Sequence, residues 1–135
     1  MTIPIEISQI QGASELEEWF GYWPSFHDAE VVRLHLNRKA PAPSSLVVHT
    51  WEMTKELDAR GYYVLAKHVV VEFLMNEVVD LSLRGFSHQN VLFGLTIETT
   101  ENGFRLNMDD NYGISGTIDA KQISIRLTPG KPTDS

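Results

Sequence analysis

Apolar and polar residues alternate along most of the chain, and this pattern predicts a fold rich in β-strands. In the longest apolar segment, residues 66–76, Val69, Val71, Phe73 and Met75 occupy every second position. A period of two is typical of a strand that buries one face and exposes the other. Similar segments follow one another, separated by residues that favour turns. Together they predict seven to eight strands, near residues 30–37, 45–52, 66–76, 78–84, 91–100, 103–108, 112–118 and 122–127.

A different period near the N-terminus predicts one helix, over residues 14–22. Its apolar stripe consists of Leu16 together with Trp19, Phe20 and Trp23, which follow Leu16 at three, four and seven positions. Ser14 followed by Glu17 fits a capping box at the start of the helix. Pro24 restricts the residue before it to extended conformations, so the helix is expected to end there.

The connections between the predicted strands indicate antiparallel pairing. Asn102-Gly103 is a strong hairpin signal, and residues 38–44 and 54–62 are expected to be loops. Most other turns are short, whereas parallel strands need connections of about a dozen residues or more. We therefore expect an α+β fold, in which a strongly bent, mainly antiparallel sheet or partial barrel of seven to eight strands is accompanied by one N-terminal helix.

Length and composition fit one domain. With 135 residues, 42% of them hydrophobic, the chain can bury a sizeable core. We expect a single domain over residues 1–128 and a frayed tail over residues 129–135. No apolar run approaches the ~18 residues of a membrane-spanning helix, and the N-terminus lacks the features of a secretory signal. The absence of cysteine excludes disulfides and thiolate chemistry and is compatible with the cytoplasm, the location we expect.

The net charge narrows the possible partners. Eighteen acidic residues against 11 basic ones give a formal charge of −7, which argues against direct binding to nucleic acid. An acidic surface favours solubility, or association with a cationic partner.

The segment from Trp23 to Glu30 carries the most unusual chemistry, because it combines aromatic residues with adjacent ionisable ones. We expect Trp23 and Phe26 to be largely buried and the carboxylate of Asp28 to accept backbone hydrogen bonds. His27 and Asp28 are adjacent, and adjacent side chains on an extended strand point to opposite faces. The pair is therefore not expected to converge on one ligand, and no catalytic residue is assigned.

The five histidines do not form a metal-binding pattern. Ligands on one strand normally lie two positions apart, and ligands on a helix three or four apart, but no two histidines have either spacing. His35 and His68 could meet only across strands, with Glu72 on the same face as His68. We expect no metal and no cofactor.

Three segments together resemble the Immunity protein 50 family of bacterial polymorphic-toxin systems. The resemblance covers roughly residues 15–128. Its segments are Trp23-Pro24-Ser25-Phe26-His27-Asp28-Ala29-Glu30-Val31, Val69-Val70-Val71-Glu72-Phe73, and Gly85-Phe86-Ser87-His88-Gln89-Asn90-Val91, which leads into Leu95-Thr96-Ile97.

The resemblance implies a small α+β protein that neutralises a cognate toxin by stoichiometric binding and has no catalytic residues. In the last segment, Gly85 and Asn90 are expected to supply unusual backbone angles. His88 and Gln89 are expected either to be surface contacts or to tie this turn to His27 and Asp28. The acidic charge suggests a basic, nuclease-like toxin. The alternative is a small enzyme or ligand-binding domain that uses His27, Asp28 and Glu30, with His35 as a further candidate. The oligomeric state stays open.

Overall fold

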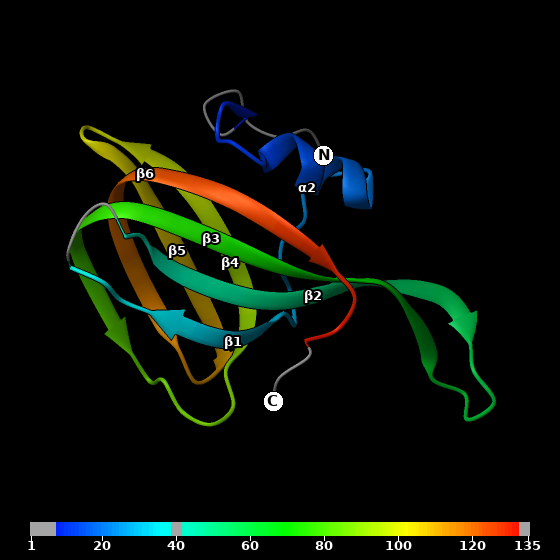
Figure 1. Cartoon of the computed structure of the whole chain (residues 1–135). Helices are drawn as coiled ribbons and strands as arrows, with labels where there is room; N and C mark the ends of the chain where they lie inside the picture. Colours follow the sequence, from blue (N-terminus) through cyan, green and yellow to red (C-terminus); the bar gives the residue numbers. More distant parts are fainter. Residues whose placement is uncertain (1–7, 39–41, 133–135) are drawn as a thin grey trace.

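The computed structural model describes residues 8–38 and 42–132, and in this part of the chain six antiparallel strands accompany one short helix (Figure 1). These elements are α2 (Ala13–Phe20), β1 (Glu30–His35), β2 (Ser44–Leu57), β3 (Tyr63–Arg84), β4 (Val91–Thr100), β5 (Gly103–Tyr112) and β6 (Ser115–Pro129). The predicted antiparallel α+β fold is confirmed. In the described residues, no helix has the length and apolar character needed to span a membrane.

The six strands form a ring in the order β1-β2-β3-β6-β5-β4. Five pairs of neighbours form ladders of five or more residue pairs, but β1 and β4 share a single residue pair, Glu30 opposite Val91. The ring therefore has a narrow seam and differs from a barrel with continuous hydrogen bonding. The core fills the ring from inside. The residues of β3 that were predicted to share one buried face, Val69, Val71, Phe73 and Met75, are all fully buried.

The prediction of seven to eight strands is wrong, because two expected breaks do not interrupt pairing. Segments 66–76 and 78–84 belong to β3 alone, which passes through Glu77 at φ 56° with a register shift between Val78 and Asp80. Such a bulge bends a strand without ending it. The predicted strand 122–127 and most of the predicted strand 112–118 likewise belong to one strand, β6. Between them, Ala120 is buried opposite Val78. Local sequence indicates a change of period at these points, but pairing with neighbours keeps each strand whole.

The helix begins one residue earlier than predicted and has no capping box. Its N-cap residue is Gly12, at φ 91°, and the described residues include no side-chain capping hydrogen bond at this position. A Cβ on Gly12 would lie 1.8 Å from the carbonyl oxygen of Ile125, so only glycine fits this approach to β6. The backbone N–H of Ile125 donates to the carbonyl of Gln11 at 2.7 Å. The helix start is therefore determined by contact with β6 and not by Ser14 and Glu17.

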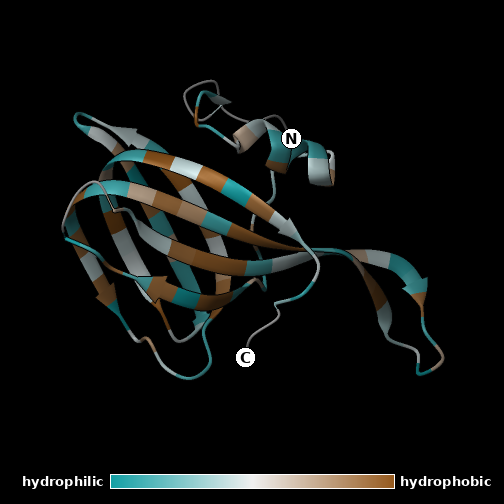
Figure 2. Cartoon of the chain, viewed as in Figure 1, coloured by the Kyte–Doolittle hydropathy of each residue, from teal (hydrophilic) through white to brown (hydrophobic). Residues whose placement is uncertain are grey.

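Beyond the ring, β2 and β3 continue together as a projecting hairpin, here called the arm (residues 51–67; Figure 1). The predicted loop over 54–62 is wrong for residues 54–57, since strand pairing reaches Leu57 opposite Tyr63, and is confirmed for residues 58–62, which connect the two strands. The carboxylate of Asp58 accepts the backbone N–H groups of Arg60 and Tyr62 at 2.8 and 3.0 Å and so orders the tip. Figure 2 shows hydrophobic residues on the arm as well as on the ring.

At the C-terminal end, pairing continues past the expected domain boundary. Pro129 is the last residue of β6 and lies opposite Val69, and the N–H of Gly130 donates to the carbonyl of His68 at 2.8 Å. The first residues assigned to the frayed tail thus pair with β3. Residues 133–135 of that tail lie outside the described part of the chain.

Candidate functional site

The segment between α2 and β1 folds as a tight turn against the core. Phe26 and Asp28 have positive φ angles of 64° and 66°, and the N–H of Ala29 donates to the carbonyl of Phe26 at 3.1 Å. The Phe26 ring is buried and packs edge-on against Phe73, with 5.7 Å between ring centroids. The predicted burial of Phe26 is confirmed. Trp23 is only half-buried and packs at the margin of the core.

This turn brings His27 and Asp28 together, contrary to the sequence-based expectation. His27 Nδ1 lies 3.3 Å from Asp28 Oδ2, and both side chains are about half exposed. The expectation assumed an extended backbone, but the left-handed conformation at Asp28 rotates its side chain toward its neighbour. Asp28 Oδ1 accepts the side-chain amide of Asn111 at 3.2 Å. In the described residues no backbone N–H donates to this carboxylate, so that prediction is wrong.

The same turn is attached to the start of β4, which places the first and third resemblance segments side by side. Asp28 N–H donates to Leu92 O at 2.8 Å and Leu92 N–H donates to Ala29 O at 2.9 Å. Val31 N–H donates to Asn90 O at 2.9 Å. These bonds extend the narrow seam between β1 and β4. The two segments therefore close the ring together.

Asn90 fixes the loop before β4 through its side chain. Its Oδ1 accepts the backbone N–H groups of Ser87 and Ile114, each at 3.0 Å, and its Nδ2 donates to Ser87 O at 2.7 Å. Gly85 has the expected unusual backbone conformation, with φ 79°, whereas Asn90 is not among the residues with positive φ. His88 and Gln89 are exposed on this loop, and the link to the His27 turn is made by the Asn90 backbone.

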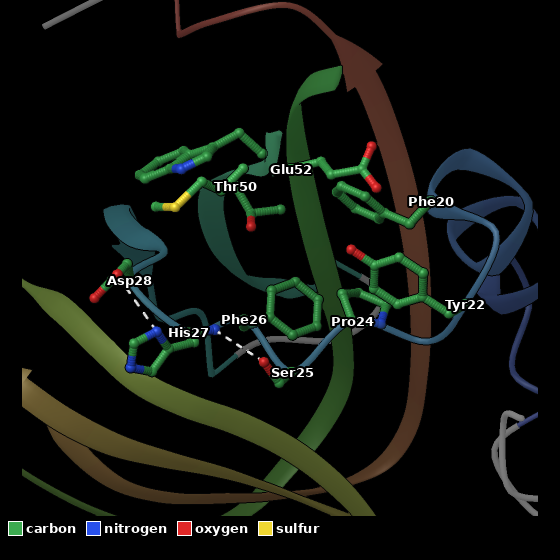
Figure 3. Close-up of a pocket in the computed structure, with 11 residues that line it drawn as sticks. Phe20, Tyr22, Pro24, Ser25, Phe26, His27, Asp28, Thr50 and Glu52 are labelled. Carbon is green, nitrogen blue, oxygen red and sulfur yellow. Dashed lines mark hydrogen bonds and ion pairs between the residues drawn. The ribbon is translucent and has the colours of Figure 1, made fainter. Parts of the chain in front are cut away.

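A groove separates the turn from the uncovered edge of β2 (Figure 3). Its volume is about 350 Å³. One wall is formed by the segment from Phe20 to Asp28, and the other by Thr50, Trp51, Glu52 and Met53. The groove combines aromatic rings with the carboxylates of Asp28 and Glu52, and none of the described lysines or arginines lines it. Its chemistry suits a cationic or amphipathic group.

Beside the groove, Glu30 belongs to a chain of ionisable side chains that sequence reasoning missed. His49 Nδ1 lies 2.9 Å from Glu30 Oε1, and His49 Nε2 lies 3.1 Å from His68 Nδ1. Trp51 packs against both imidazole rings, with centroid separations of 4.9 and 6.0 Å. His49 is buried, so these bonds satisfy both of its ring nitrogens. A histidine inside the apolar run 46–50 was the available signal, because a buried imidazole requires partners.

When both imidazoles are neutral, the two ring nitrogens of His49 are each hydrogen-bonded. His49 donates from Nδ1 to the Glu30 carboxylate and accepts at Nε2 from Nδ1–H of His68. Such an arrangement orients imidazole rings and can relay a proton. The cross-strand contact of His35 with His68, considered above as a possibility, does not occur: His35 pairs with Ser45, whereas His68 contacts His49. In the described residues, no group of three or more metal-ligating side chains is positioned to hold an ion.

The pKa of His68 should make stability depend on pH. Burial lowers this pKa from its usual 6.5, and the nearby His49 and Lys131 lower it further. The unfolded chain therefore binds a proton at His68 more readily, and the stabilisation present above pH ~6.5 is lost as pH falls toward the folded-state pKa. We expect urea denaturation to give a smaller unfolding free energy at about pH 5.5 than at about pH 7.5. His68→Gln should flatten this dependence, and an unchanged slope would contradict the assignment to His68.

A comparison with protein-family models matches residues 12–129 to Immunity protein 50. The chain belongs to the Immunity protein 50 family. The match spans the whole ring and the arm, together with the turn at Phe26 and the loop at Asn90. Searches of the curated proteins and of the solved structures found no significant match. Family membership points to an immunity function for this Immunity protein 50 chain, and the resemblance read from its sequence is confirmed.

Proposed function

We propose that this protein neutralises a cognate bacterial toxin by stoichiometric binding in the cytoplasm, without turnover and without a metal or cofactor. The observation that carries the proposal is the family match over residues 12–129. The geometry is compatible with it. His49 uses both ring nitrogens in structural contacts, and the His27–Asp28 pair is exposed and lies outside the core.

Charge suggests the chemistry of the partner. The formal charge of the chain is −7, and among the described residues the groove contains Asp28 and Glu52 but no lysine or arginine. A basic toxin, such as a nuclease, would complement this surface. Electrostatic attraction of that kind mainly accelerates association and weakens as salt screens it.

The test is a titration of the toxin encoded beside this gene. With a binding mechanism, toxin activity should fall to zero at about one immunity protein per toxin, and raising salt should slow association far more than it speeds dissociation. A charge-matched acidic protein of unrelated fold serves as control. Inactivation of many toxin equivalents by one molecule of this protein would contradict the stoichiometric mechanism. An association rate that does not change with salt concentration would refute only the proposed electrostatic attraction.

The second candidate function is a small enzyme or ligand-binding domain that uses His27, Asp28 and Glu30. The observation in its favour is the contact of Glu30 with His49, which continues to His68 beside the groove. However, Glu30 does not line the groove that holds His27 and Asp28. His49→Gln distinguishes the two functions. Catalysis that uses the hydrogen-bonded side chains of Glu30, His49 and His68 would be lost in this variant. Stoichiometric protection would remain, with each folded molecule of the variant neutralising about one toxin molecule.

A further inference from the structure

The arm is a part of the sheet whose outer edges have no strand neighbours in the described residues. Pairing of β1 with β2 ends at Glu30 opposite His49, and pairing of β6 with β3 ends at Val69 opposite Pro129. Beyond these points, β2 and β3 pair only with each other. A two-stranded ribbon has little stability of its own in water. Its base is supported by a 2.9 Å hydrogen bond from Trp19 Nε1 to Lys67 O, but the remainder projects from the ring.

One face of the arm is mainly apolar and open. The register places Met53 opposite Leu65 and Leu57 opposite Tyr63, and directly opposed residues share a face, as do residues two apart on one strand. All four side chains therefore lie on the same face, and by the same rule the exposed Lys55, two positions from both Met53 and Leu57, lies there as well. Their exposed fractions are 58% for Met53, 61% for Leu57, 56% for Tyr63 and 39% for Leu65. Contiguous exposed apolar side chains on a soluble protein are typical of an interaction surface.

The arm itself carries Glu52, Glu56 and Asp58 against Lys55, Arg60 and Lys67 and has no net charge, so the acidic groups of the groove at its base distinguish between partners. Met53 belongs both to the apolar face and to the groove, where Asp28 and Glu52 lie. Glu52 lies 3.6 Å from the ammonium group of Lys67, while the side chains of Asp28 and Glu30 are 46% and 55% exposed. A second copy of this chain would bring the same acidic groove and a further charge of −7. A partner with lysine or arginine around an apolar patch is complementary instead.

We propose that the apolar face of the arm is the main docking surface for the cognate toxin, which presents an apolar patch bordered by lysine or arginine side chains. This inference rests on the proposed function and adds the surface that performs it. The arm supplies the buried apolar contact, and Asp28 and Glu52 meet the cationic border.

The test measures binding of the full-length protein to a catalytically inactivated form of the toxin encoded beside its gene. Tyr63→Ser/Leu65→Ser should raise the Kd about 30-fold or more, the effect of losing central apolar contacts of an interface. Val79→Ser/Leu81→Ser is the matched control, because these side chains lie two apart on the same strand and are 54% and 39% exposed. The control should change the Kd by less than about threefold. Leu57→Ser near the tip is a second arm variant.

The outcomes separate the docking surface from the function. If the wild-type protein binds the toxin and both arm variants bind it with unchanged affinity, the proposed docking surface is refuted and the immunity function is not. Failure of the wild-type protein to bind or neutralise the toxin would overturn both. Sedimentation without toxin provides another check: a wild-type dimer that Tyr63→Ser/Leu65→Ser converts to monomer would identify a second copy as the occupant and refute the proposal. Glu52→Gln should slow association, and an unchanged association rate would contradict the cationic border.

Discussion

Replacing Phe26 with alanine is expected to lower the unfolding free energy by about 3–5 kcal/mol, the usual cost of removing a buried phenylalanine ring. The ring is 1% exposed and packs edge-on against Phe73 within the ring of strands. Its removal would leave a cavity where the turn before β1 meets the core. The turn also bonds to β4, so loss of the ring should loosen the narrow seam of the fold.

Equilibrium denaturation with urea, followed by tryptophan fluorescence and circular dichroism, measures this loss. Phe86→Ala is the matched control, since it deletes the same side chain at a position that is 60% exposed. The control should change stability by no more than about 0.5 kcal/mol. A loss below about 1 kcal/mol for Phe26→Ala would show that the turn does not depend on core packing.

Asn90→Ala is expected to lower the unfolding free energy by about 2–4 kcal/mol. Its Oδ1 is the acceptor for the N–H groups of Ser87 and Ile114, and a buried donor left without an acceptor costs about 1–3 kcal/mol. Asn90 is buried. A Cβ on Gly113 would lie 2.4 Å from Asn90 Oδ1, so the packing there is tight and leaves little room for a compensating rearrangement.

The neighbouring substitution Gln89→Ala is the control for Asn90→Ala. Gln89 lies on the same loop but is exposed, so its replacement should change stability by about 0.5 kcal/mol or less. Hydrogen exchange at the amide of Ile114 gives a local readout, because this amide should exchange faster in Asn90→Ala. Protection equal to that of the wild-type protein would contradict the role of the Oδ1 acceptor.

The sequence predicted those features of the candidate site that depend on the type of a single residue. The apolar character of Phe26 predicted its burial, and Gly85 was expected at an unusual backbone angle; both are confirmed. Side-chain contacts that depend on a backbone reversal were predicted wrongly. His27 meets Asp28 because the turn is left-handed at Asp28, and alternation along a strand cannot indicate such a conformation.

By itself, the sequence determined the family, through the segments that resemble it. It also determined the antiparallel class of the fold and the residues on the inner face of β3, because the hydrophobic period and the turn residues are local properties of the sequence. Only the tertiary structure decided that six strands close into a ring, that His49 reaches Glu30 and His68, and that β2 and β3 project as an arm. These features depend on register between distant segments. A bulge such as the one at Glu77 changes that register without ending the strand, because pairing with neighbouring strands outweighs local preference.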